Sequence, residues 1–154
     1  YARLIEECHE AGRKVCLDAS GELLRQGILA KPDMVKPNRR ELEYLAGRQL
    51  TNLEEIKAQA RKLVARGVGK VVVSLGAEGL LCLDGEQELY QKAARVRAVN
   101  TVGCGDTVVA SLCMSELAGE EADIALRKAA ALAAANAATR ENGVIPMELY
   151  LELL

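Results

Sequence analysis

Residues 99–112 read Val-Asn-Thr-Val-Gly-Cys-Gly-Asp-Thr-Val-Val-Ala-Ser-Leu, and the turn at Gly103–Asp106 is the most informative part of the chain. Two glycines, Gly103 and Gly105, let the backbone turn sharply and come close to a ligand. The apolar run after Asp106 predicts a helix that begins here, so several backbone N–H groups without partners point into the turn. These donors and the helix dipole favour a bound anion, above all a phosphate. An aspartate at this place indicates a base beside a phosphate.

The same four residues have a simpler interpretation. A Gly-x-Gly-Asp sequence is more often only a tight turn followed by an acidic residue in the first turn of a helix. Taken alone, the turn therefore does not establish a phosphate site, and the rest of the chain has to decide between the two interpretations.

Composition and charge limit the class of protein. A chain of 154 residues forms about one domain and buries roughly 68–70% of its unfolded surface. Half of the residues are hydrophobic and 27% are charged, as in soluble globular proteins. A net charge of −2 with interspersed signs argues against nucleic-acid binding. No apolar stretch is long enough for a membrane span, and no signal-peptide pattern is found within residues 1–154, so no membrane segment is expected here.

Cysteine and histidine usage points the same way. The five cysteines are odd in number and lack the CxxC spacing, which predicts reduced thiols in a cytoplasmic protein. A single histidine, His9, excludes a metal cluster built from histidines. The absence of Phe and Trp requires an aliphatic core.

Strand and helix patterns alternate along the chain and predict an α/β fold with a mainly parallel sheet and a local antiparallel hairpin. A helix opens the sequence before any strand, which predicts that an N-terminal part with further strands is missing. Helices are expected at 1–11, 37–46, 53–65, 105–118 and 122–141, with a last short one from Pro146. Strands are expected at 14–17, 33–36, 70–75 and 96–99, and the hairpin at 80–83 and 88–92 around Asp84-Gly85.

A second motif, Ser74-Leu75-Gly76-Ala77-Glu78-Gly79, directly follows the Val-rich strand expected at 70–75. Open α/β sheets bind ligands at the carboxyl ends of their parallel strands. There Gly76 and Gly79 would let backbone amides approach a nucleotide phosphate, and the Ser74 hydroxyl would add a donor. The alternative is a glycine-rich turn into the next strand. The chain contains neither a Walker A loop nor a GxGxxG fingerprint.

A third motif, Lys36-Pro37-Asn38-Arg39-Arg40-Glu41, again lies at a strand end. Asn38 can cap the following helix, and Glu41, three residues later, can complete a capping box. The same amide and carboxylate oxygens also suit a Mg²⁺ ion that keeps most of its water shell near phosphates. The two interpretations are compatible.

Together, the three segments at 33–46, 70–83 and 96–112 resemble the C-terminal half of the ribokinase-like (PfkB) carbohydrate kinases. They are most similar to the hexose-phosphate branch, typified by 1-phosphofructokinase and tagatose-6-phosphate kinase. The resemblance extends over nearly the whole chain and implies a three-layer α/β/α fold. Members of the family are about twice this length, so the resemblance also implies that the N-terminal sugar-binding part and its lid are missing.

The resemblance implies roles for individual residues. Asp106 would be the catalytic base that takes the proton of the acceptor hydroxyl, and Gly103, Cys104 and Gly105 would form the anion hole. The nucleotide phosphates would be lined by Lys36, Ser74, Gly76 and Gly79. Asn38 and Glu41 match the Asn-x-x-Glu motif that influences Mg²⁺ and phosphate, so Asn38 would also belong to the nucleotide site. Asn136 stands where the family often places a polar residue beside adenine, with a helix-packing amide as the alternative.

Two positions depart from the family pattern, and a third differs from ribokinase itself. Cys104 stands where Ala, Gly or Ser is usual, but only its backbone N–H is needed, so the anion hole is retained and the thiol is expected to be unusually reactive. Ser111 replaces a customary Ala or Gly. Asn100 stands where ribokinase has Asp, which favours the hexose-phosphate branch and puts a monovalent-cation site in doubt.

The predicted function is ATP- and Mg²⁺-dependent phosphorylation of a phosphorylated ketose, foremost fructose 1-phosphate to fructose 1,6-bisphosphate. ATP, ADP and the sugar phosphate are the expected partners, with no nucleic acid or membrane, and a homodimer is expected for the full-length protein. A tagatose-6-phosphate kinase, or a ribose or nucleoside kinase, is the alternative enzyme. A nucleotide sensor or an inert folded fragment is the alternative from another class, and the isolated fragment is expected to transfer little phosphate.

Overall fold

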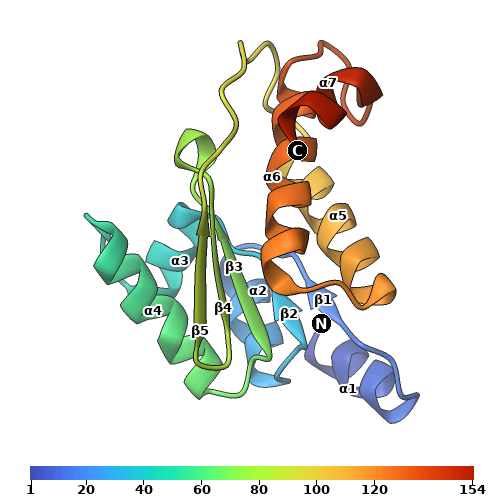
Figure 1. Cartoon of the computed structure of the whole chain (residues 1–154). Coiled ribbons are helices and arrows are strands. Elements are labelled where there is room, and N and C mark those ends of the chain that lie inside the picture. Colours follow the sequence, from blue (N-terminus) through green and yellow to red (C-terminus); the bar gives the residue numbers. More distant parts are fainter. The chain divides into compact units, whose positions relative to one another are not determined.

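The computed structural model describes residues 1–154, which divide into two compact units (Figure 1). The first unit comprises Tyr1–Leu75 and Leu81–Glu88, and the second comprises Gly76–Leu80 and Leu89–Leu154. None of the helices is both long enough and apolar enough to cross a lipid bilayer.

Three short parallel strands organise the first unit: β1 (Cys16–Leu17), β2 (Met34–Val35) and β3 (Lys70–Ser74). Cys16 pairs with Met34, and Met34 in turn pairs with Lys70. This register brings the carboxyl ends of the three strands to one edge of the sheet, where an open α/β sheet places its ligands. The expected strands at 14–17, 33–36 and 70–75 are thus confirmed in type and order, with β1 and β2 shorter than expected.

Helices α1 (Ala2–Glu10), α2 (Gly21–Leu29), α3 (Arg39–Ala46) and α4 (Leu53–Ala65) pack around one aliphatic core in this unit. Helix α4 has the predicted bounds because Asn52 caps its first turn and apolar residues recur on one face. Helix α2 was not predicted from the sequence. Two glycines, Gly21 and Gly27, lower the helix propensity of this segment. Packing requires a glycine at position 27, because a Cβ there would lie 2.6 Å from Leu17 Cδ2.

The sheet continues from β3 through β4 (Leu80–Asp84) to β5 (Gln87–Gln91), giving the order β1-β2-β3-β4-β5. Only Gly85 and Glu86 connect β4 to β5, so these two strands form the expected antiparallel hairpin. Gly85 has a φ of 58°, the left-handed conformation that such tight turns require.

Helices α5 (Cys104–Ala118), α6 (Ala122–Ala137) and α7 (Met147–Leu153) form the body of the second unit. Alanines such as Ala129 and Ala130 give α6 a small-residue surface, and α5 and α6 pack side by side (Figure 1). Helix α7 begins after Pro146, as expected.

Two expectations for this unit were wrong. No strand forms at 96–99; instead the N–H groups of Val99 and Asn100 both donate to the carbonyl of Ala137, at 2.7 and 3.1 Å. These bonds occupy a terminal carbonyl of α6, and the helix ends at Ala137 rather than near Glu141. The segment before α5 is therefore held by the end of a helix and not by a sheet.

Candidate active site

The N-terminus of α5 is built around Gly103, which is the residue before the helix and has a φ of 78°. This left-handed conformation is one that glycine adopts without strain. Gly105, in contrast, lies inside the first helical turn, so only one of the two glycines makes the turn. No side chain caps α5, and the N–H groups of Gly105 and Asp106 have no acceptor four residues earlier in the helix. The turn thus offers donors for an anion.

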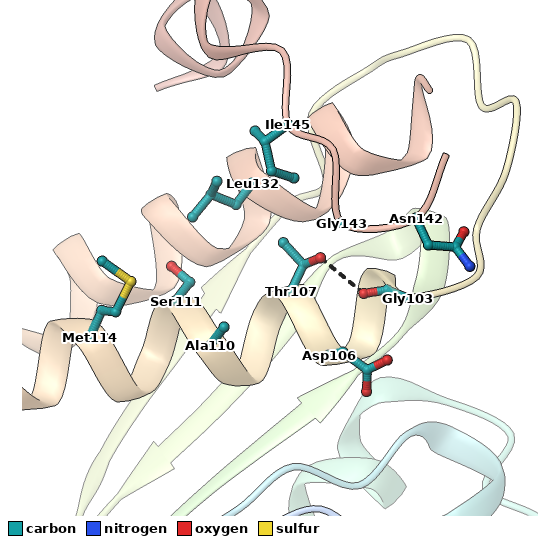
Figure 2. A pocket seen from close by; sticks show the side chains of 10 residues that line it. All are labelled: Gly103, Asp106, Thr107, Ala110, Ser111, Met114, Leu132, Asn142, Gly143 and Ile145. Carbon is teal, nitrogen blue, oxygen red and sulfur yellow. Dashed lines mark hydrogen bonds between the residues drawn. The ribbon is translucent and has the colours of Figure 1, made fainter. Parts of the chain in front are cut away.

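Asp106 lies in the first turn of α5, exposed and without a hydrogen bond or ion pair. With Gly103, Thr107, Asn142 and other residues it lines a pocket of 460 Å³. Figure 2 shows its carboxylate pointing away from Leu132 and Ile145, which lie on the apolar side of the pocket. A free carboxylate beside unpaired backbone donors can accept a proton from a group held at the turn.

Cys104 and Asn136 contact each other beneath this turn. The Cys104 thiol donates to the carbonyl of Ala133 over 3.5 Å, and the Asn136 amide nitrogen lies 3.4 Å from Cys104 Sγ. Asn136 is 1% exposed, and its amide also bonds to Val102 and Gly143. The structure therefore gives Asn136 contacts within the protein; a role beside adenine stays a prediction.

The remaining predicted residues of the first unit lie at strand ends. Lys36 directly follows β2 and is 4% exposed, and its ammonium lies 3.4 Å from the carboxylate of Asp18, which directly follows β1. Burying a charge is costly unless it is paired, so this ion pair makes the buried lysine tolerable. Asn38 forms an isolated bridge with Ser74 at the end of β3. Lys36, Asn38 and Ser74 thus share one edge of the sheet.

Asn38 and Glu41 form the predicted capping box of α3. Asn38 Oδ1 accepts the N–H of Glu41 at 3.0 Å, and Glu41 Oε2 accepts the N–H of Asn38 at 2.8 Å. The other carboxylate oxygen of Glu41 takes no part in the capping box, so that oxygen and the negative charge remain available to a ligand. No group of three His, Cys, Asp or Glu side chains that could hold a metal ion occurs in the structure. The pair alone cannot enclose a metal ion, and a Mg²⁺ ion that keeps most of its waters beside Asn38 and Glu41 stays a prediction.

The loop after Ser74 forms a short 3-10 turn at Gly76–Glu78. Gly76 has a φ of 60° and open space around it, which leaves its backbone accessible to a ligand. Gly79 has a structural reason instead, since a Cβ there would lie 2.0 Å from the Gln91 carbonyl oxygen. The Tyr90 hydroxyl donates to the Glu78 carbonyl over 2.5 Å and ties the loop to β5.

Asp18, Tyr90 and Asn142 also belong to these surroundings and were not predicted from the sequence. Asp18 could have been found, because an acidic residue follows the first strand as Lys36 follows the next. Tyr90 and Asn142 carried no sequence signal, since their partners lie 12 and 42 residues away along the chain.

The fold and the turn define a class: an α/β protein with an uncapped helix N-terminus and an exposed carboxylate in the first turn of that helix. The model of the pfkB family carbohydrate kinases matches residues 1–148. The chain belongs to that family.

Individual relatives agree with this assignment. The chain is 45% identical over 113 residues to a 1-phosphofructokinase of Haemophilus influenzae, covering 73% of this chain and 36% of that protein. It is 42% identical over 120 residues to a 1-phosphofructokinase of Escherichia coli, covering 78% of this chain and 38% of that protein.

Solved structures confirm the ribokinase-like fold. Phosphofructokinase-2 from Escherichia coli, in complex with substrates and products, matches 99% of this chain and 50% of its own with a TM-score of 0.92 and 27% identity. Ribokinase from Arabidopsis thaliana, complexed with ribose and ATP, matches 99% of this chain and 51% of its own with a TM-score of 0.86 and 26% identity. The chain thus spans about half the length of these proteins, and less of the curated relatives.

Proposed function

We propose that the protein transfers the γ-phosphoryl group of ATP to a hydroxyl of a sugar phosphate, with Asp106 as the base. The observation that carries this proposal is the uncapped N-terminus of α5, where free backbone donors adjoin an exposed, unpaired carboxylate. Membership of a carbohydrate kinase family supports it. Residues 1–154 would supply the nucleotide-binding and base part of the kinase, and residues outside this range would supply most sugar contacts.

The chemistry asks little of the protein beyond position and charge. The sugar hydroxyl oxygen forms a bond to the γ-phosphorus, the bond to the bridging oxygen of ADP breaks, and the hydroxyl proton moves to the Asp106 carboxylate. Negative charge on the transferring group would be stabilised by the N–H groups of Gly103, Cys104 and Gly105, with the Cys104 N–H exchanging its long 3.4 Å contact with the Thr101 carbonyl for the phosphoryl oxygen. A positioned base typically contributes about 10²–10⁴-fold.

The nucleotide phosphates would be bound by the charge of Lys36 and by donors at Ser74, Gly76 and Gly79. Mg²⁺, when bound, would neutralise phosphate charge, and Asn38 and Glu41 would orient its water shell. Two observations support this assignment. Asn38 and Glu41 form one capping box just after β2, and the buried Lys36 ammonium is paired with the Asp18 carboxylate.

Fructose 1-phosphate is the proposed acceptor, with fructose 1,6-bisphosphate as product, because the curated relatives at 42–45% identity are 1-phosphofructokinases. A coupled assay of the full-length protein that contains these residues tests it against tagatose 6-phosphate, fructose 6-phosphate and ribose. The highest kcat/KM is expected for fructose 1-phosphate. A higher value for another sugar would reassign the substrate.

The second candidate is a nucleotide-binding protein without catalysis. Activity on none of the four sugars, together with retained ATP binding, would favour it. We also propose a homo-oligomer, supported by the tetrameric inhibited form described for Escherichia coli phosphofructokinase-2. Light scattering of the full-length protein would measure its mass, and a monomer would contradict this.

A further inference from the structure

Three asparagines connect the segment before α5 to the segment after α6. Asn136, on α6, donates from Nδ2 to the Val102 carbonyl at 3.2 Å, while its Oδ1 accepts the Gly143 N–H at 2.8 Å. Because this side chain is 1% exposed, both bonds are shielded from water. Its amide thus links two loops that are 41 residues apart.

Asn100 makes the complementary contacts from the other side. Its Oδ1 accepts the Val102 N–H at 3.0 Å, and its Nδ2 donates to the Arg140 carbonyl at 3.0 Å and to Asn142 Oδ1 at 2.7 Å. We name Asn100, Asn136 and Asn142 the amide clamp. The clamp holds both the N–H and the carbonyl of Val102.

Holding Val102 matters because of the residue that follows it. The Val102 carbonyl and the Gly103 N–H belong to the same planar peptide unit, so fixing one fixes the direction of the other. Gly103 is the residue that makes the left-handed turn, and glycine has the most conformational freedom to lose. Without an external hold, the donors of the turn would not keep one direction.

We propose that Asn136, through Val102, is a positioning residue that fixes the Gly103–Asp106 turn in its anion-binding form. Preorganised donors stabilise transition-state charge because they need no rearrangement during the reaction. The proposal rests on the proposed kinase function. It differs from a direct contact to adenine, which a side chain with both polar atoms bonded within the protein does not require.

Two variants of the full-length protein test the clamp. Asn136→Asp keeps the acceptor for Gly143 but faces the Val102 carbonyl with an oxygen in place of a donor. Asn100→Asp keeps the acceptor for the Val102 N–H but loses both donors, and it lies at a partly exposed position. It is assayed without K⁺ or Na⁺, because ribokinase has Asp at this position and a bound cation could replace the lost contacts. Gln59→Glu makes the same chemical change at a buried amide on α4, in the other unit, and serves as the control.

Steady-state kinetics with ATP and fructose 1-phosphate, and the melting temperature, are measured for each variant. We expect kcat to fall about ten- to 100-fold in both clamp variants, below the roughly 10²–10³-fold of a lost oxyanion donor. KM for ATP should stay within a few-fold, and Gln59→Glu should keep kcat. If Asn136→Asp does not fold, the kcat of Asn100→Asp tests whether the amide clamp positions the turn.

The outcomes separate the two proposals. Phosphoryl transfer by the unaltered protein combined with normal kcat in the clamp variants overturns the role of Asn136 only. The positioning role of Asn136 is also overturned if Gln59→Glu loses kcat as well and if the loss in every variant follows the fall in its melting temperature. No phosphoryl transfer by the unaltered protein to any of the sugars overturns the proposed function, and the positioning role with it.

Discussion

The Lys36 ammonium lies 3.4 Å from the Asp18 carboxylate, and the two residues directly follow neighbouring parallel strands. A lysine has three N–H donors, and one carboxylate at this distance does not satisfy all of them. The buried ammonium at this sheet edge is therefore suited to bind a second anion.

Replacing Lys36 tests this suitability. Lys36→Met should weaken ATP binding about tenfold or more, the size of one charge-assisted hydrogen bond, and leave AMP binding nearly unchanged. Isothermal titration calorimetry measures both affinities. Lys70→Met is the matched control, because Lys70 forms a comparable 3.3 Å ion pair with Asp84. Equal weakening of ATP and AMP would argue against a contact with the terminal phosphates.

Asp106→Asn removes the proposed base without changing the shape of the side chain. Turnover should fall by about 10²–10⁴-fold, while ATP affinity changes by a few-fold at most. The comparison variant is Asp123→Asn, which alters the acidic residue in the first turn of α6 and should be silent. Near-normal kcat in Asp106→Asn would exclude Asp106 as the base.

Asn38 has both a structural and a functional role in our proposal, and a paired variant separates them. Asn52 caps α4 by the same contact, with its side chain accepting the Glu55 N–H at 2.9 Å. Asn38→Ala and Asn52→Ala should each lower the free energy of unfolding by about 1 kcal/mol, measured in urea. Only Asn38→Ala should raise the Mg²⁺ concentration needed for half-maximal activity. The same Mg²⁺ dependence in both variants would leave Asn38 a cap and nothing more.

Stability at acid pH should depend on Asp33. Burial acts to raise the pKa of Asp33, but the Val15 N–H and the neighbouring His9 outweigh it, so the pKa is lowered from its usual value. A carboxyl whose pKa is lower in the folded state stabilises the protein above its unfolded pKa, and this stabilisation is lost as pH falls through the folded pKa. Urea unfolding from neutral pH to about pH 3 should therefore show a smaller loss of stability in Asp33→Asn. Identical pH profiles would contradict this.

The cysteines should differ in reactivity. Burial raises the pKa of Cys82 to about 11, so its thiol should be alkylated slowest at neutral pH. ATP should slow the alkylation of Cys104, whose backbone belongs to the proposed anion hole. Mass spectrometry of peptides after timed iodoacetamide treatment measures both rates. Uniform labelling of all five cysteines, with or without ATP, would contradict an anion site at this turn.

Local signals were sufficient to predict much of the fold. The bounds of α4 follow from periodic apolar residues and the Asn52 cap, and the capping box of α3 follows from the three-residue spacing of Asn38 and Glu41. Helix α2 was missed because Gly21 and Gly27 weaken its local signal, whereas the need for Gly27 arises from its contact with Leu17 on β1. The helical structure of Gly21–Leu29 therefore depends on tertiary packing, which local sequence patterns do not reveal.

The surroundings of the α5 turn were predicted less completely. The left-handed Gly103 and the uncapped first turn agree with the sequence pattern. The partners of Asn136 do not follow from it, because Val102 lies 34 residues earlier in the chain. An asparagine in an alanine-rich helix indicates that its amide needs hydrogen-bond partners when it is buried. The sequence does not identify those partners, which are the Val102 carbonyl and the Gly143 N–H.

The hydrogen bond from the Gly143 N–H to Asn136 also bears on a spontaneous chemical change of the chain, the deamidation of Asn142. Asn142 precedes Gly143, and in such a pair the glycine nitrogen can attack the asparagine side-chain carbonyl, forming a succinimide and releasing ammonia. Here that nitrogen is held 2.8 Å from Asn136 Oδ1, and Asn142 Oδ1 is held 2.7 Å from Asn100 Nδ2. Both contacts therefore oppose the approach of the Gly143 nitrogen to the Asn142 side chain that deamidation requires. The same three side chains thus hold the Val102–Gly103 peptide and restrain the Asn142–Gly143 pair.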